Sequence, residues 1–219
     1  MTGPIAIDYY TDALCVWAWI AQPRLEELQR QWDRQLEVRH RFVDVFGDSH
    51  SKITRRWGEQ DGFERFCSHV AESAAAFDEC VVNPAVWSSV RPHSSLQAHL
   101  LLKAAALVAG VEAVAPLALS IRRAFFVEAM NISDQSVLLG LAAEAGLNCT
   151  AMQESLRDGR ALAALSDDQR SANELGVRGS PTWVINDGRQ ILYGNVGYRI
   201  LHANIEELLK HPGAEASWC

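Results

Sequence analysis

The segment from Ile5 to Ala18 constrains the fold more than any other part of the chain. Its first residues form a short apolar run rich in isoleucine and tyrosine, which is typical of a buried β-strand. A turn region, Thr11 to Leu14, follows, and Cys15 then stands where a helix is expected to begin. A cysteine at a helix N-terminus faces unpaired backbone N–H groups and the positive end of the helix dipole, and both favour its thiolate. The sequence therefore predicts a strand and a helix that present one reactive sulfur.

The order of elements after Cys15 predicts a mixed α/β fold. Residues 36–45 alternate between apolar and polar side chains, and because a full helix separates them from the first strand, we expect the two strands to pair in parallel. A long block without strands follows, and the expected helices are 62–77, 94–108, 114–129, 134–145 (capped by Ser133), 150–156 and 160–175. The chain then returns to strands at 181–186 and 189–193, joined by a tight turn at Asn186 to Gly188, and closes with a helix at 198–210.

Composition and charge exclude several classes of function. The 219 residues carry a formal net charge of −7, which argues against nucleic acid or an anionic membrane as the main partner. No apolar run approaches the length of about 18 residues that a membrane-spanning helix needs. The N-terminus lacks the basic and apolar segments of a signal peptide, so we expect a cytoplasmic location.

The five cysteines are Cys15, Cys67, Cys80, Cys149 and Cys219. An odd and widely spaced set in a chain of this length is not a disulfide framework, and the histidines do not cluster with the cysteines as zinc ligands would. We therefore expect no metal site. The three middle cysteines are interpreted as packing residues and Cys219 as an exposed bystander, whereas the position of Cys15 at a helix start favours a reactive thiolate with a pKa below the usual value of about 8.5.

Three stretches resemble the DsbA-like family with a thioredoxin fold, in particular its FrnE-like branch of dithiol-disulfide isomerases. They are D-A-L-C-V-W-A-W at residues 12–19, G-V-R-G-S-P-T at residues 176–182 and I-S-D-Q-S-V-L-L-G-L-A-A-E-A-G-L at residues 132–147. The resemblance implies a thioredoxin fold with an inserted all-helical domain. The thioredoxin-like domain would comprise residues 4–48 and 158–210, the inserted domain residues 49–157, and a C-terminal tail residues 211–219.

The resemblance also implies roles for single residues. Cys15 matches the attacking cysteine of the family, Pro181 the cis-proline that faces it, and Ser180 the residue before that proline. Around them, Asp12 and Trp17 are candidates for contact with substrate, although a turn residue and a core residue are the simpler interpretations. The chain departs from the family at Ala18, because the usual Cys-x-x-Cys motif is here C-V-W-A and the resolving thiol is missing.

A single thiol leaves three functions open. Cys15 can exchange disulfides through a mixed disulfide if another thiol releases the product, with protein thiols or glutathione as partners. Glutathione is then a co-substrate, and no permanently bound cofactor is expected. The chain also resembles glutathione-dependent enzymes of the kappa-transferase and 2-hydroxychromene-2-carboxylate isomerase type, which lack a dithiol but commonly carry serine at the position of Cys15. The third alternative is a non-catalytic module that binds an extended peptide beside Ser180 and Pro181. The sequence leaves the oligomeric state open, with a homodimer as one alternative.

Overall fold

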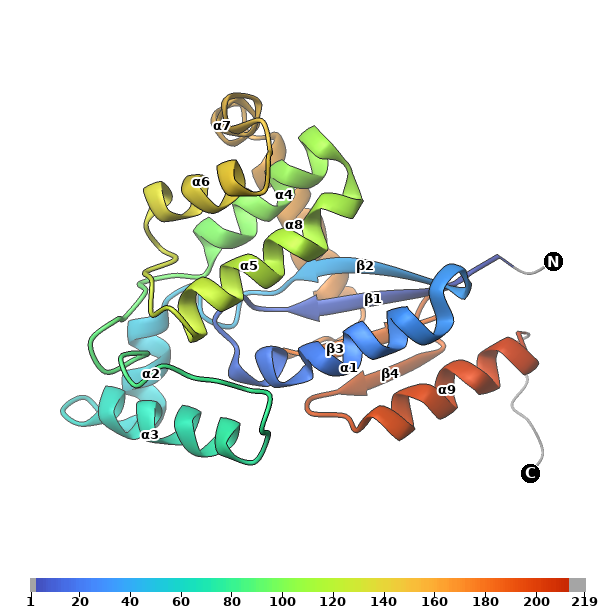
Figure 1. Ribbon diagram of the computed structural model, residues 1–219, viewed down its shortest axis with the longest axis horizontal. Coiled ribbons are helices and arrows are strands. Elements are labelled where there is room, and N and C mark those ends of the chain that lie inside the picture. Colours follow the sequence, from blue (N-terminus) through green and yellow to red (C-terminus); the bar gives the residue numbers. More distant parts are fainter. Residues whose placement is uncertain (1–2, 213–219) are drawn as a thin grey trace.

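The computed structural model describes residues 3–212 and contains a four-stranded sheet with helices on both faces (Figure 1). The strands are β1 (Ile5–Thr11), β2 (Leu36–Phe42), β3 (Thr182–Ile185) and β4 (Gln190–Tyr193). The helices are α1 (Val16–Trp32), α2 (Ser49–Trp57), α3 (Gly62–Ala75), α4 (Leu96–Ala109), α5 (Val114–Phe126), α6 (Gln135–Glu144), α7 (Cys149–Arg157), α8 (Arg160–Glu174) and α9 (Tyr198–Lys210). The α/β fold class predicted from the sequence is confirmed.

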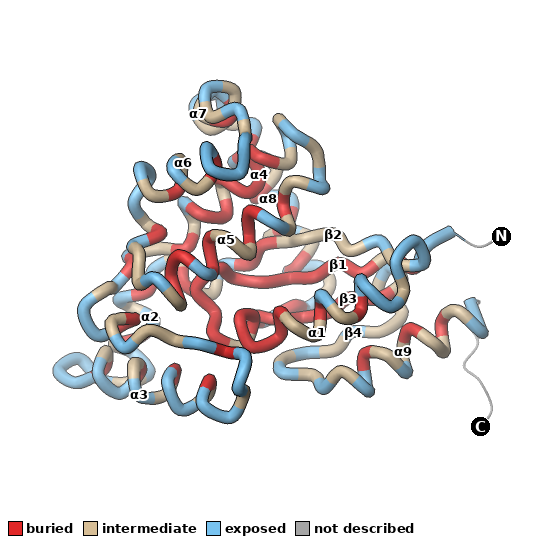
Figure 2. Tube along the Cα trace, viewed as in Figure 1, coloured by how far each residue is buried: buried red, intermediate tan, exposed pale blue. Residues whose placement is uncertain are grey.

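The strands lie in the order β2-β1-β3-β4. β1 pairs in parallel with β2, from Ile5 opposite Leu36 to Thr11 opposite Phe42, and the other two pairs are antiparallel. Because β1 is central, almost all of its residues are buried (Figure 2). The expected tight turn between β3 and β4 is present, since Asp187 and Gly188 have φ angles of 54° and 93°, the pair of positive values that a two-residue hairpin loop requires.

Successive residues of β1 point to opposite faces of the sheet, so each face has its own apolar core. On one face Tyr9 packs with α1 and α9, through residues such as Leu25 and Leu201. On the other face Tyr10 packs with Val184 of β3 and Ala172 of α8. The sheet is therefore covered on both sides, as its nearly continuous apolar strands require.

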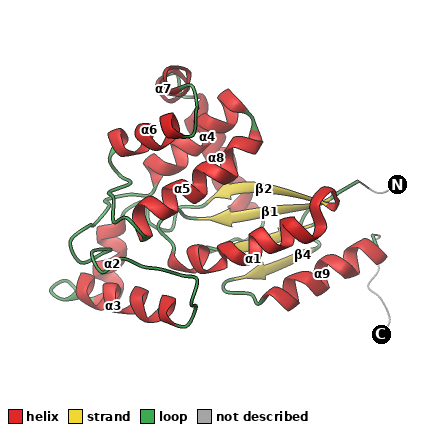
Figure 3. Cartoon of the chain, in the orientation of Figure 1, coloured by secondary structure: helices red, strands yellow, loops and turns green. Residues whose placement is uncertain are grey.

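Two groups of helices lie between β2 and β3 in the sequence. Helices α2 and α3 lie at the end of the sheet to which β1 and β2 point, and α4–α7 lie beside the sheet (Figures 1 and 3). The largest apolar cluster contains residues of the expected thioredoxin-like domain and of the expected inserted domain, for example Trp19 of α1 with Leu101 of α4 and Phe125 of α5. Helix α8 contacts both α4 and β2. The expected boundaries at residues 48, 49, 157 and 158 stay a prediction, as does the tail at residues 211–219, most of which lies outside the described residues.

A buried ionic group joins α8 to the sheet and to α4. The carboxylate of Asp168 is fully buried and lies 3.0 Å from Nη1 of Arg41 on β2 and 2.5 Å from Nζ of Lys103 on α4. It also accepts a hydrogen bond from the backbone N–H of Phe42 at 3.0 Å. Two cations and one N–H thus neutralise and satisfy a carboxylate that would otherwise be costly to bury.

Three local predictions are corrected by the structure. β2 ends at Phe42 instead of at residue 45, because the N–H groups of Val45 and Phe46 bind the side chain of Asp12 and not a neighbouring strand. After β2, the expected helices began at residue 62, so α2 was not predicted as a separate helix. Helix α6 is capped by Asp134, which accepts a hydrogen bond from the N–H of Ser136, and not by Ser133.

None of the helices in residues 3–212 is long and apolar enough to cross a bilayer.

Candidate active site

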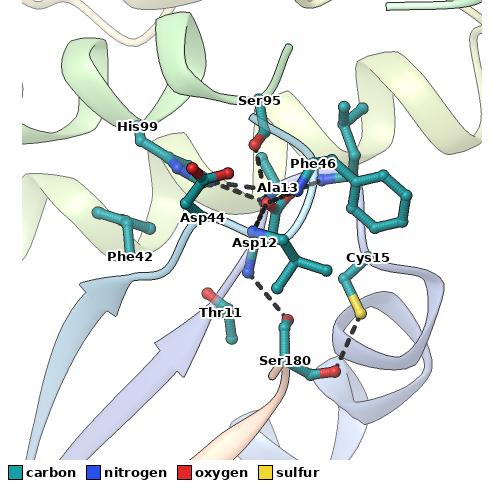
Figure 4. Close-up of polar contacts among 12 residues, drawn as sticks. Thr11, Asp12, Ala13, Cys15, Phe42, Asp44, Phe46, Ser95, His99 and Ser180 are labelled. Atoms are coloured by element: carbon teal, nitrogen blue, oxygen red, sulfur yellow. Dashed lines mark hydrogen bonds and ion pairs between the residues drawn. The ribbon is translucent and has the colours of Figure 1, made fainter. Parts of the chain in front are cut away.

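Cys15 stands at the N-cap position of α1, as predicted, and its side chain points to the segment before β3 (Figure 4). The residue is only 5% exposed, and its thiol donates a hydrogen bond to the backbone carbonyl of Ser180 at 3.1 Å. The peptide bond between Ser180 and Pro181 is cis. The structure therefore brings together Cys15 and Ser180, which are 165 positions apart in the sequence.

Asp12 organises the loops around Cys15. Its backbone N–H donates to the hydroxyl of Ser180 at 2.9 Å. Its carboxylate is fully buried and accepts hydrogen bonds from four donors at 2.8–3.0 Å, namely the N–H groups of Leu14, Val45 and Phe46 and the hydroxyl of Ser95 (Figure 4). Asp12 thus ties the ends of β1 and β2 to the start of α4. It does not line the groove described below, in contrast to the expected contact with substrate.

His99 lies beside this network and was not singled out from the sequence. Its side chain is fully buried, and its Nε2 accepts a hydrogen bond from the N–H of Ala13 at 3.1 Å. Burial lowers the pKa of His99, although the nearby Asp12 carboxylate raises it. The ring is therefore neutral with its proton on Nδ1, and it supports the turn that leads to Cys15.

The pKa of Cys15 does not follow the sequence-based prediction. Burial raises the pKa of the thiol, and the Asp12 carboxylate adds to this increase. Hydrogen bonding with Ser180 and with the backbone at Ala18 and Trp17 acts in the opposite direction, and burial prevails. The expected fall in pKa is therefore wrong for this structure. The resting group is a thiol, as its donation to a carbonyl oxygen requires.

Cys15 opens on a groove of about 490 Å³ between α1, α2, α3 and the segment before β3. Trp17 and Ser180, both named from the sequence, line this groove. The other lining side chains are mostly apolar or aromatic and include Phe46, Ile53, Trp57, Phe66 and Tyr193. An apolar groove that contains a few polar groups is typical of a binding site for a small molecule or a peptide side chain.

The charged lining of the groove is entirely basic, which the sequence analysis missed. Lys52 and Arg56 of α2 and Arg178 before β3 all line it, and no aspartate or glutamate of residues 3–212 does. None of these three cations has an ion pair in the part of the chain that the structure describes. Lys52 and Arg56 are four residues apart on one helix, so they share a face. The groove therefore offers positive charge to a ligand although the chain as a whole is acidic.

Tyr193 forms one wall of the groove because Gly179 leaves room for it. A Cβ atom at position 179 would lie 2.7 Å from the hydroxyl oxygen of Tyr193. Only glycine permits this close approach without moving the ring. The tyrosine is 66% exposed, so its phenol is open to a ligand in the groove.

No second described thiol lines the groove. Ala18 is fully buried at the position of the missing cysteine. Cys80 is buried, and its Sγ lies 4.0 Å from the Trp19 carbonyl oxygen, which Pro23 leaves without its helical N–H donor. Cys67 and Cys149 are half-buried, and both are free. Cys219 lies outside the described residues. Cys15 is thus the one described sulfur that a ligand in the groove meets.

A four-stranded sheet, a cysteine at the N-cap of α1 and a cis-proline segment beside it are the features expected of a thioredoxin-like protein. Residues 6–206 match a family described as DSBA-like thioredoxin domain. The chain belongs to the DSBA-like thioredoxin family. This match covers nearly the whole chain, and the DsbA-like resemblance of the sequence is confirmed, whereas the FrnE-like branch stays a prediction.

Two curated proteins of related sequence are ClpXP adapter proteins called SpxH. The protein from Halalkalibacterium halodurans is 23% identical over 215 residues, which are 94% of this chain and 68% of that protein. The protein from Bacillus subtilis is 26% identical over 180 residues, which are 82% of this chain. In that comparison the chain spans only 57% of the length of its relative.

Solved structures of the same fold include DsbA-like oxidoreductases. A putative protein disulfide isomerase from Nitrosomonas europaea has a TM-score of 0.79 at 16% identity, with 96% of this chain and 100% of that chain covered. The cytosolic disulfide reductase DsbM from Pseudomonas aeruginosa has a TM-score of 0.71 at 23% identity, with 94% and 98% covered, and its structure with GSH matches as well. A 2-hydroxychromene-2-carboxylate isomerase has a TM-score of 0.65 at 17% identity, with 94% and 97% covered. At these identities the likeness shows the fold, which is that of the DsbA-like thiol–disulfide oxidoreductases.

Proposed function

We propose that this DSBA-like protein catalyses thiol–disulfide exchange through Cys15 alone. The observation that carries the proposal is the position of this thiol, which lines the groove at the start of α1 and is the only described thiol to do so. Ala18 has no sulfur, so the intermediate has no internal partner at the usual position. Trp17, Ser180 and Pro181 form the surroundings in which we place the substrate.

Each half of the proposed reaction balances. The Cys15 thiolate attacks one sulfur of a substrate disulfide, a bond forms between the two sulfurs, and the other substrate sulfur leaves as a thiolate. A second thiolate from outside then attacks the mixed disulfide and releases Cys15. The net reaction transfers one disulfide bond between two partners, so two electrons move between them and none remain on the protein.

Glutathione is the co-substrate that fits this scheme best. Reduced glutathione carries one thiol, two carboxylates and one ammonium group, so it is a net anion. The groove places Lys52, Arg56 and Arg178 around a thiol, with no acidic side chain among its described lining residues. A solved structure of DsbM, which is described as a cytosolic disulfide reductase, is of the protein with GSH. A cytoplasmic location, where glutathione is abundant, belongs to the same proposal.

Incubation with oxidised glutathione tests the proposal. We expect mass spectrometry of the intact protein to show one glutathione adduct, peptide mapping to place it on Cys15, and added reduced glutathione to remove it. The variant Cys15→Ser is expected to show none, while Cys67→Ser, which changes a half-buried thiol outside the groove, is expected to behave like the wild type. An adduct confined to other cysteines, or none at all, would contradict the proposal.

A glutathione-dependent transferase or isomerase is the second candidate. It is favoured by the lack of a resolving thiol and by the fold shared with a 2-hydroxychromene-2-carboxylate isomerase. Cys15 stands where such enzymes commonly carry serine, which favours exchange instead. Tight binding of reduced glutathione without an adduct, retained in Cys15→Ser and accompanied by conjugating or isomerising activity, would favour this candidate over the first.

A binding module without catalysis is the third candidate. The curated relatives are described as ClpXP adapter proteins, so a related chain acts by binding another protein. Such a function would survive the loss of the sulfur. If the Cys15→Ser variant replaces the wild-type protein in the cell without loss of function, binding is sufficient and exchange is not needed.

A further inference from the structure

The guanidinium of Arg122 is a buried charge without a carboxylate partner among the described residues. Arg122 belongs to α5 and is only 1% exposed. Its Nη2 donates to the hydroxyl of Thr11 at 2.8 Å, and its Nη1 lies 3.4 Å from the amide oxygen of Gln22. Its Nε has no acceptor, and no acid in residues 3–212 lies within ion-pair distance of it.

Such an arrangement needs a physical explanation. A guanidinium stays charged in proteins, and the transfer of a charge from water to a protein interior is expensive unless an opposite charge compensates it. Elsewhere in this chain, buried Asp168 is paired with Arg41 and Lys103, and the buried carboxylate of Asp12 has four hydrogen-bond donors. Two neutral acceptors satisfy part of the hydrogen bonding of Arg122, but they do not neutralise it.

The two acceptors place the charge next to the helix that carries Cys15. Thr11 is the last residue of β1, four positions before Cys15, and Gln22 lies on α1. Cys15, Ala18 and Gln22 are spaced three and four residues apart, so they follow one face of the helix. The guanidinium therefore lies along the face of α1 that begins with the reactive sulfur.

A further link between the two residues is the effect of Cys15 on the pKa of the guanidinium. Although burial lowers the pKa of Arg122, negative charge on Tyr9, Cys15 or Asp12 raises it. Coupling between two titrating sites is reciprocal, so the positive charge of Arg122 favours the thiolate of Cys15, although burial, the hydrogen bond with Ser180 and the charge of Asp12 affect the pKa of Cys15 more.

We propose that Arg122 is a positioning residue that supplies the buried counter-charge for the thiolate formed at Cys15. The charge is compensated incompletely while Cys15 is a thiol and becomes better compensated when the proton leaves. The inference rests on the proposed function only in that Cys15 reacts as a thiolate. It does not depend on which disulfide or ligand the groove accepts.

Other charged groups also act on Cys15. Asp12 opposes a thiolate from the β1 side, whereas burial raises the pKa of Tyr9, so that its phenol is neutral, and His99 of α4 is neutral as well. The groove adds the cations Lys52, Arg56 and Arg178, with His69 of α3 beside them. The groove cations face solvent, where salt screens them, whereas Arg122 is shielded from solvent. Its effect on Cys15 is therefore expected to persist at high salt.

Two substitutions at Arg122 separate charge from packing. Arg122→Gln removes the charge and keeps a hydrogen-bonding side chain, and Arg122→Lys keeps the charge. We expect the half-point of Cys15 alkylation against pH, measured in 0.5 M salt at temperatures below each Tm, to rise by about one pH unit in Arg122→Gln. Alkylation below that half-point then falls about tenfold, and Arg122→Lys restores most of it. Arg123→Gln, which changes the exposed neighbouring arginine of α5, is the matched control.

A second variant covers the outcome in which Arg122→Gln does not fold. Gln22→Glu places a carboxylate beside the guanidinium and is expected to raise the half-point in the same direction, because the charge is then neutralised locally. A half-point unchanged in either folded variant would overturn the proposal, and so would Arg122→Lys if it behaved like Arg122→Gln. Alkylation requires no disulfide substrate. If the alkylation half-points of these variants shift as expected but the protein shows no exchange with glutathione, the proposed function is disproved and this inference stands.

Discussion

The thiol of Cys15 donates a hydrogen bond to the carbonyl of Ser180, and the two atoms are 3.1 Å apart. The hydroxyl of Ser180 in turn accepts from the N–H of Asp12 at 2.9 Å. Ser180, the residue before the cis-proline, therefore contacts both the reactive sulfur and the loop that precedes Cys15. The segment that we expect to bind substrate also holds the resting thiol in its protonated form, which determines how the site should respond to pH.

The reactivity of Cys15 is expected to rise late with pH. Because burial raises the pKa of Cys15, alkylation of the folded protein should have a half-point above the ordinary cysteine value of about 8.5. The same shift links pH to stability. The unfolded thiol ionises first, so the stabilising contribution is complete below the unfolded pKa and is lost as pH rises through the folded pKa. Cys15→Ser should accordingly lose less Tm than the wild type between pH 8 and pH 10, and a half-point below 8.5 would contradict the prediction.

A cysteine at position 18 should allow the protein to resolve the mixed disulfide with its own second thiol. Ala18 is fully buried at the position where the family carries its second cysteine. In Ala18→Cys we expect the introduced thiol to displace glutathione from Cys15 and to leave an intramolecular disulfide, which mass spectrometry detects as loss of the adduct. The extra sulfur in a packed position should lower stability by about 1–3 kcal/mol. Ala21→Cys, also buried on α1 but packed on the opposite core, should retain the adduct.

Gly179→Ala tests the wall formed by Tyr193. The added Cβ would lie 2.7 Å from the phenol oxygen, so the ring must move out of its position over Gly179. We expect kcat/KM for exchange to fall about fivefold, equivalent to about 1 kcal/mol of contact with one aromatic ring. The substitution should have no further effect in a Tyr193→Ala background. Gly140→Ala, at a position with open space around it, is the control and should leave exchange unchanged.

The basic groove predicts a preference for acidic substrates. Arg56→Gln removes one lining cation, and we expect KM for oxidised glutathione to rise about two- to fivefold at low salt, with a smaller effect at high salt. Exchange with an uncharged disulfide should be unaffected. Arg55→Gln changes the adjacent exposed arginine, which does not line the groove, and serves as the matched control. Equal effects of the two substitutions would show that only the net charge of α2 matters.

Asp168→Asn should be far more destabilising than its surface neighbour. The substitution leaves Arg41 and the mostly buried Lys103 without their shared carboxylate, and we expect a loss of about 3–5 kcal/mol in the free energy of unfolding. Asp167→Asn breaks an exposed pair with Arg170 and should lose about 0–1 kcal/mol. Urea denaturation of both variants checks the difference, which would vanish if the buried group contributed no more than the exposed pair.

Much of the fold could be predicted because it depends on local patterns. Apolar periodicity located β1, α1 and the closing helix, and the turn at Asp187 and Gly188 was visible from its residue types. The end of β2 could not be predicted in this way. Val45 continues an alternating pattern, but its N–H is taken by a carboxylate from another loop.

The candidate site divides in the same manner. Cys15, Ser180 and Pro181 carry recognisable motifs, so they were named from the sequence together with Trp17. Arg56 belongs to no motif, and Arg178 lies within the G-V-R-G-S-P-T stretch but was given no role from the sequence, since an arginine in a helix or a loop is usually a solvated surface residue. Only their position in the groove distinguishes them from the other arginines of the chain.

The sequence by itself determined the order of the elements, the single thiol at the start of α1 and the absence of a cysteine at Ala18. Only the tertiary structure decided the protonation of that thiol, the basic character of the groove and the burial of Arg122. The physical reason is that local sequence sets backbone propensity and the helix dipole, which favour a thiolate. Burial and charge around Cys15 instead depend on α2, α4, α5 and the segment before β3, which are distant in the chain and adjacent only after folding.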